Sequence, residues 1–159
     1  MSTTGHIDRA AMKTSASKRM AASPEKIFAL LLDPGKHGLF DGSGMVGDQI
    51  AGPDRLELGS KFGMNMKFGP LPYRISNTVV EFVENELIAW EHFGKHRWRY
   101  ELEPTVDGQT LVTETFDWST ALIPKAIDKV GYPTRHLTSI EQTLDRLAEI
   151  VEADEIGST

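Results

Sequence analysis

Hydrophobic residues near the end of the chain recur every three or four positions and predict one long amphipathic helix. Charged residues occupy the opposite face, among them Glu141, Asp145 and Glu149. The helix would begin at Thr138, which forms a capping-box pair with Glu141, or earlier, near Thr134. The apolar stripe consists of Leu137, Ile140, Leu144, Leu147, Ala148 and Val151.

The first forty residues predict a strand followed by a helix. Residues 12–22 have the pattern of a strand of modest β-propensity. Ser23, Pro24 and Glu25 then begin a helix, because serine caps free N–H groups, proline suits the first turn and an acid favours the positive end. Residues 33–35 (Asp-Pro-Gly) end this helix, and residues 37–40 form one further helical turn.

From residue 45 the pattern changes to short strands separated by Gly, Pro, Asn and Asp. Because the connections are short, neighbouring strands should pair antiparallel. Residues 122–130 form a hinge with a short helix after Pro124. The predicted strands cover residues 45–50, 61–68, 73–83, 87–93, 96–103 and 110–118.

This order of elements predicts an α+β fold in which a curved antiparallel sheet of about six or seven strands wraps around the C-terminal helix. We expect a single domain over residues 12–153, a flexible N-terminal tail at residues 1–11 and a C-terminal tail at residues 154–159. A sheet curled around a helix leaves a hollow, and such hollows hold apolar small molecules.

Composition excludes several classes of function. The 159 residues contain no cysteine, so disulfides, thiolate metal sites and cysteine nucleophiles are excluded. This suits a reducing cytoplasm, which is the predicted location. The net charge of −6 argues against nucleic acid as a partner. No apolar run approaches the roughly 18–20 residues of a membrane span, and residues 1–10 lack the apolar core of a secretory signal.

Two apparent ligand motifs are rejected. Residues 42–47 match the Gly-x-Gly-x-x-Gly dinucleotide pattern, which works only between a strand and a helix, whereas here a helix precedes and a strand follows. His92 and His96 could approach across a hairpin, but with His37 or Asp41 they lack the tight spacing of a zinc site. We therefore expect no metal and no cofactor.

Aromatic residues in strand 96–103 supply the first candidates for ligand contact. Trp98 and Tyr100 alternate with Arg97 and Arg99, so the aromatic pair should face the helix. Their polar N–H and O–H groups could orient a ligand, although both are equally ordinary core residues.

The strand at residues 110–118 leaves two registers open. If Asp107 and Gly108 make a two-residue turn, the odd-numbered residues from 111 to 117 face the hollow. If a bulge shifts the alternation, the even-numbered residues do so instead, including Glu114 and Phe116. We favour the second register because it buries the larger apolar groups.

The favoured register places Glu114 beside Tyr100 inside the hollow. A carboxyl group there would have a raised pKa and could act as a general acid or base, or bind a ligand hydroxyl. In the other register Glu114 points to water beside Arg99. The hairpin at Gly94 is open in the same way: a three-residue loop turns Ile88, Trp90 and His92 inward, whereas an even loop turns residues 87, 89, 91 and 93 inward. We favour the first.

Two further polar candidates, His37 and Asp41, follow the first helix. A histidine and an aspartate four residues apart could form a hydrogen-bonded acid–base pair. Asp41 followed by Gly42 is also ordinary turn chemistry. The candidates for proton transfer are therefore Glu114, Tyr100, His37 and Asp41.

The element order and the sequence SPEKIFALLLDPGKH at residues 23–37 resemble the helix-grip superfamily called SRPBCC or START-like. Within it the chain is similar to the polyketide cyclase/dehydrase group, through HGLFDGSG at 37–44, RWRYELEP at 97–104 and TLVTETFDW at 110–118. The resemblance covers about residues 13–153. It implies a deep cavity under the C-terminal helix that binds lipids, sterols, polyketides or other apolar ligands, and some relatives are cyclases or aromatases.

Three functions follow from these patterns, and we favour the first. It is a binding protein for an apolar or aromatic small molecule, with Glu114 as the polar contact. The second is a cyclase or aromatase in which Glu114, Tyr100 or His37 moves protons. The third is an interaction module, such as a homodimer through the exposed strand face, with a cavity too full to bind anything. The predicted ligand contacts are Trp90, Trp98, Tyr100, Glu114 and Phe116.

Overall fold

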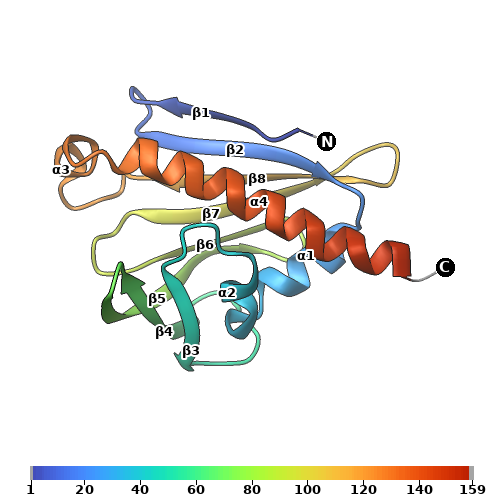
Figure 1. Ribbon diagram of the computed structural model, residues 1–159, viewed down its shortest axis with the longest axis horizontal. Coiled ribbons are helices and arrows are strands. Elements are labelled where there is room, and N and C mark those ends of the chain that lie inside the picture. Colours follow the sequence, from blue (N-terminus) through green and yellow to red (C-terminus); the bar gives the residue numbers. More distant parts are fainter. Residues whose placement is uncertain (1, 158–159) are drawn as a thin grey trace.

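The computed structural model describes residues 2–157 and contains a curved eight-stranded antiparallel sheet with a long helix, α4, against its inner side (Figure 1). The strand order is β1-β2-β8-β7-β6-β5-β4-β3. The predicted α+β helix-grip fold is confirmed. The strands are β1 (Thr4–Asp8), β2 (Lys13–Met20), β3 (Val46–Ala51), β4 (Lys61–Phe68), β5 (Leu71–Val83), β6 (Leu87–Glu91), β7 (Arg97–Pro104) and β8 (Thr110–Asp117).

The helices begin at recognisable sequence signals. Ser23 caps α1 by accepting a hydrogen bond from the Lys26 N–H at 3.3 Å, with Pro24 in the first turn. The long helix begins at Tyr132, earlier than either predicted start, because Pro133 fits its first turn. The helical segments are α1 (Pro24–Leu31), η1 (Pro34–Lys36), α2 (His37–Phe40), α3 (Pro124–Lys129) and α4 (Tyr132–Gly157).

Both predicted tails differ from the structure. Residues 4–8 form β1, which pairs with β2 along its whole length. The close approach of this strand to α4 requires a glycine, because a Cβ at Gly5 would lie 2.7 Å from the Leu137 side chain. This strand was not predicted because its sequence is polar, and its pairing with β2 holds it in place. At the other end α4 continues to Gly157, and residues 158–159 of the predicted tail lie outside the described residues. The assignment of residues 12–153 to one domain stays a prediction.

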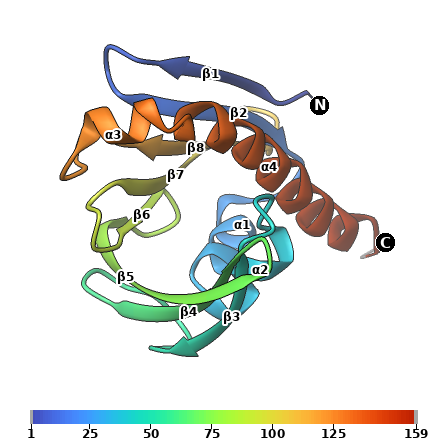
Figure 2. The ribbon, with the colours of Figure 1, turned by 60° about the vertical axis from the view of Figure 1, so that its left-hand side comes forward.

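The apolar stripe of α4 packs into the curve of the sheet, as Figure 2 shows. Leu137 is half-buried, and the other members of the stripe are buried. On the sheet side the core continues through Met20, Leu102 and Val112. Burial of this stripe therefore fixes the position of α4 over β2 and β8.

The open question of register is settled by loop length. Tyr100 lies opposite Glu114 and Trp98 opposite Phe116, so the favoured face of β8 is turned inward. The cause differs from the one expected: residues 105–109 form a five-residue loop with Gly108 at φ +78°, and no register shift interrupts the β7–β8 pairing. Five residues again, at positions 92–96, connect β6 to β7 and turn Trp90 inward, in place of the three-residue loop expected. An odd loop of either length gives the same alternation.

Candidate ligand-binding site

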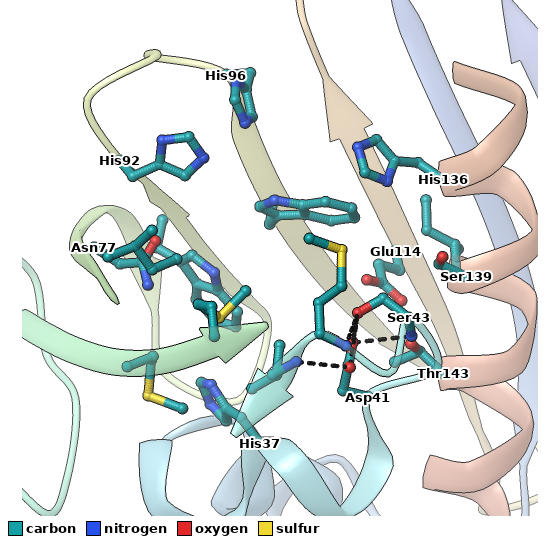
Figure 3. Close-up of a pocket in the computed structure, with 18 of the residues that line it drawn as sticks. His37, Asp41, Ser43, Asn77, His92, His96, Glu114, His136, Ser139 and Thr143 are labelled. Carbon is teal, nitrogen blue, oxygen red and sulfur yellow. Dashed lines mark hydrogen bonds between the residues drawn. The ribbon is translucent and has the colours of Figure 1, made fainter. Parts of the chain in front are cut away.

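A cavity of about 520 Å³ lies between the inner face of the sheet and α4 (Figure 3). The sheet contributes a mainly apolar wall and α4 closes the opposite side with Ile140, Ser139 and Thr143. The hypothesis of an interaction module assumed a cavity too full to bind anything, and the presence of this space contradicts that assumption. The apolar lining includes Phe62, Met64, Met66, Ile75, Trp90 and Trp98.

Aromatic rings line the cavity in two groups whose members contact one another. The His37 ring stacks on Trp90, with ring centroids 4.9 Å apart and 17° between the planes. Trp90 contacts Tyr100 at 5.6 Å, and His136 from α4 contacts Trp98 at 4.9 Å. Three of the predicted ligand contacts, Trp90, Trp98 and Tyr100, therefore line the cavity.

Phe116 does not line the cavity. It is fully buried and packs against Trp98 at 4.9 Å and His136 at 4.4 Å. The alternation of β8 placed Phe116 correctly on the inner face, but the rings of other residues cover it. The structure therefore assigns Phe116 a supporting position in place of the predicted ligand contact.

Glu114 and Tyr100 form a buried polar pair. The Tyr100 Oη donates a hydrogen bond to Glu114 Oε1 at 2.9 Å, and the two residues are only 4% and 3% exposed. The second carboxyl oxygen, Oε2, is buried without a partner. The hypothesis that Glu114 points to water beside Arg99 is therefore wrong, because the five-residue loop turns Glu114 inward.

Burial sets the ionisation of this pair. Loss of hydration raises the pKa of Glu114 well above its usual value. The Tyr100 hydrogen bond partly opposes this rise, and the negative charge of Asp41 adds a smaller increase. Burial and the neighbouring Glu114 also raise the pKa of Tyr100 well above 10. Burial therefore favours the protonated, uncharged form of the Glu114 carboxyl group.

Asp41 and His37 do not form the expected acid–base pair. Asp41 instead holds its own turn, accepting hydrogen bonds from the Ser43 Oγ at 2.8 Å and the Val46 N–H at 3.3 Å. The His37 Nε2 bonds the Leu31 carbonyl oxygen at 2.8 Å, and burial lowers the pKa of His37 to about 4. His37 is thus a neutral wall residue at pH 7.

The turn after α2 is fixed on α4. The Gly42 N–H donates to the Thr143 hydroxyl at 2.8 Å, and a Cβ at Gly42 would lie 2.5 Å from the Ser139 carbonyl oxygen. Arg146 also donates to the Asp41 carbonyl oxygen. These contacts close the cavity at the α2 end.

Three histidines line the cavity, His92 and His96 from the loop between β6 and β7 and His136 from α4 (Figure 3). The rings of His92 and His96 are 4.2 Å apart, and burial lowers the pKa of both, that of His96 to about 4. Burial also lowers the pKa of His136 to about 4. Within residues 2–157, no three His, Asp or Glu side chains are arranged so that they could hold a metal ion together.

Sequence reasoning missed several lining residues. His136 lies one turn before Ile140 on the buried stripe and would have been found by starting the helix at Tyr132. Asn77 lies on the inner face of β5 together with Ile75 and Val79, which are two residues away on either side. The alternation of side chains along a strand could have predicted this position. Ser139 and Thr143 carried no signal, because small polar residues occur on either side of a helix.

The sequence model of the AHSA1 family, described as activator of Hsp90 ATPase homolog 1-like protein, matches residues 21–152. The chain belongs to this family. It is 38% identical over 153 residues to the uncharacterized protein Rv0088 of Mycobacterium tuberculosis, a match that covers 94% of this chain and 68% of the relative. The superfamily resemblance is confirmed.

Solved structures share the fold at low identity. A protein from Rhodobacter sphaeroides superposes with a TM-score of 0.71 at 16% identity, covering 95% of this chain and 98% of that one. The Aha1 dimer from Colwellia psychrerythraea gives 0.64 at 19%, covering 92% and 98%. The Polyketide_cyc-like protein Cgl2372 from Corynebacterium glutamicum gives 0.63 at 19%, covering 92% and 95%. Within residues 2–157, no helix has both the length and the apolar character needed to cross a bilayer.

Proposed function

We propose that this AHSA1-family protein binds an apolar or aromatic small molecule in the cavity between its sheet and α4. The observation that carries the proposal is a cavity of about 520 Å³ with aromatic and methionine walls and one deep polar pair. Small-molecule sites are typically of about this size and character, roughly 300–1,000 Å³. Trp90, Trp98, Tyr100 and Glu114 would contact the ligand. Lipids, sterols and polyketide-like molecules are the candidate classes, bound in the cytoplasm.

Two measurements test this proposal. Native mass spectrometry of freshly purified protein should detect a carried-over adduct of small-molecule mass. A thermal-shift screen with fatty acids, sterols and aromatic polyketides should raise the melting temperature with at least one class, because a ligand that binds only the folded state stabilises it. The shift should be lost in Trp98→Ala and Tyr100→Ala. Shifts that persist in both variants would contradict the site assignment, and no adduct with no shift would contradict the function.

A second candidate is an enzyme of the polyketide cyclase or aromatase type. It is favoured by the unpartnered Oε2 of Glu114, which could transfer a proton to a bound substrate. The variant Glu114→Gln separates the two functions, since an amide can hold a ligand but cannot act as an acid. Turnover that is lost while affinity is kept would favour the enzyme.

A second copy of the chain is a further proposed partner. The support is the structure of a dimeric Aha1 protein that shares this fold. Size-exclusion chromatography with light scattering should then give twice the monomer mass of 17.7 kDa. A monomer at all concentrations tested would contradict the dimer and leave the cavity proposal untouched.

A further inference from the structure

We propose that the cavity selects uncharged ligands that present a hydrogen-bond acceptor, such as a ketone or quinone oxygen, to the carboxyl group of Glu114. This inference rests on the proposed small-molecule function and names the ligand class for the same site. Its basis is the unequal environment of the two carboxyl oxygens of Glu114.

One oxygen of Glu114 is already satisfied and the other is not. Oε1 accepts the hydrogen bond of the Tyr100 hydroxyl, whereas Oε2 is buried with no partner. A buried polar atom without a partner costs free energy, so native structures contain few of them and a specific one calls for an explanation. Because Glu114 lines the cavity, a ligand could supply the missing partner (Figure 3).

The surroundings of Glu114 favour a proton on Oε2. The charged group that acts on it from the α2 side is Asp41, which is negative and opposes ionisation. From β7 the facing group is the neutral Tyr100, and its neighbour on β2 is Ala16. The helix lines this part of the cavity with the uncharged Ser139, Ile140 and Thr143. Since Oε1 accepts a hydrogen bond, the acidic proton belongs on Oε2. Oε2 is then a hydrogen-bond donor for which the protein supplies no acceptor.

Charged ligands suit this cavity less well. Arg135 is the one lysine or arginine among the lining residues described, and its guanidinium packs over the rings of Phe68 and Tyr132, 5.8 and 5.7 Å from their centres. An anionic group placed at Glu114 would lie near the negative Asp41, and no cation is among the groups that shift the pKa of Glu114. A cationic ligand would require Glu114 to ionise in an apolar surrounding. An uncharged molecule with one acceptor oxygen avoids both costs.

Matched naphthalene probes test the inference directly. Acetylnaphthalene carries a carbonyl oxygen, and isopropenylnaphthalene, substituted at the same position, replaces that oxygen with an isosteric CH₂ group. Titration calorimetry at neutral pH should find the ketone bound about tenfold more tightly, the usual value of one buried hydrogen bond. In Glu114→Leu the preference for the ketone should be lost or reversed, because burial of the carbonyl oxygen without the carboxyl donor costs free energy. In Glu114→Gln the preference should return, because the amide N–H can donate to the carbonyl.

The outcomes separate this inference from the proposed function. Equal affinity of the two probes for the wild type, or a preference that survives Glu114→Leu, would overturn the inference and leave the function standing. Tighter binding of naphthylethylamine, with affinity rising as pH rises, would also overturn it, because that result indicates an ionised Glu114. Failure of every naphthalene probe to bind, together with no adduct and no thermal shift from any ligand class, would instead contradict the proposed cavity function.

A wild-type measurement covers the case in which Glu114→Leu does not fold. The preference for the ketone should decline as pH is raised through the pKa of Glu114, since the ionised carboxylate repels the carbonyl oxygen. A preference that grows with pH would overturn the inference without any variant.

Discussion

Glu114 carries a single hydrogen bond, from Tyr100, and Asp41 is the charge that acts on it. Its pKa is raised chiefly because burial removes hydration from the carboxylate. This has a consequence for stability as well as for binding. A group whose pKa is higher in the folded than in the unfolded state stabilises the fold below its unfolded pKa, and that stability is lost as pH rises through the folded pKa.

We therefore expect Glu114→Gln to change the pH dependence of stability. The variant cannot ionise, so its free energy of unfolding should match the wild type most closely in acid and exceed it by a growing margin as pH rises. Urea unfolding at about pH 5 and about pH 8 measures this difference. A difference that is the same at both values would contradict a raised pKa at Glu114.

The contribution of His37 to folding stability should depend on pH in the opposite direction to that of Glu114. Its pKa falls from 6.5 to about 4 on burial, so its contribution to stability is complete above pH 6.5 and is lost as pH falls toward 4. The full loss is on the order of 3 kcal/mol. In His37→Phe, which keeps a ring to stack on Trp90, stability should fall less steeply over this interval. At neutral pH the variant should lose about 1 kcal/mol with the hydrogen bond to Leu31. An unchanged slope would refute this role.

The sequence predicted some of these residues and not others, for a physical reason. Trp98 and Tyr100 follow from alternation within one strand, a local property. The burial of Glu114 depends on how many residues the loop before β8 contains. The acid–base pair expected of His37 and Asp41 fails because His37 bonds the Leu31 carbonyl oxygen at the end of α1 and Asp41 bonds the Val46 N–H at the start of β3, which helix spacing does not reveal.

At the scale of elements, loops decide which strand face lines the cavity. The β6–β7 and β7–β8 connections each contain five residues, and each has a residue with positive φ, Lys95 and Gly108. A lysine gives little sequence signal for such a conformation. The sequence therefore left both an odd and an even number of loop residues possible at each connection and did not fix the number.

The contact between the 41–46 turn and α4 makes a sharp prediction for Gly42→Ala. The added Cβ would lie 2.5 Å from the Ser139 carbonyl oxygen and 2.6 Å from the Thr143 backbone nitrogen, so the turn must move away from the helix. We expect a loss of about 1–3 kcal/mol in unfolding free energy and weaker probe binding.

Gly38→Ala is the matched control for this prediction. Its nearest neighbour would be the Gly47 carbonyl oxygen at 3.4 Å, and it lies within the short helix α2, where alanine is favoured. Chemical denaturation of both variants should find Gly38→Ala neutral or slightly stabilising. Equal losses in the two variants would show that the close approach at Gly42 is unimportant.

At the scale of the molecule, β1 lies at the edge of the curved sheet next to β2 (Figure 2), and none of its residues lines the cavity. The element order predicted this architecture because the helix stripe and the short connections allow few arrangements. The order of elements did not predict β1, because its pairing with β2 depends on tertiary contacts and its polar sequence gives no strand signal. The cavity lining includes the half-exposed Phe68 and the 81% exposed Phe93, which mark its open end.

Removal of β1 should therefore separate stability from binding. A chain in which residues 2–9 are deleted loses the pairing with β2 and the contact with Leu137, so its melting temperature should fall. No β1 residue lines the cavity, so affinity for acetylnaphthalene at a temperature where the variant is folded should match that of the full chain. Loss of affinity in a folded truncated chain would contradict the placement of the site.

The central claim is that the space beneath α4 receives a small molecule whose oxygen meets Glu114. A crystal structure of the protein with acetylnaphthalene tests it most directly. We expect the naphthalene ring to lie against Trp90 and Trp98, with the carbonyl oxygen within hydrogen-bonding distance of Glu114 Oε2. A probe bound only on the outer surface, or one inside the cavity with its oxygen turned away from Glu114, would contradict it.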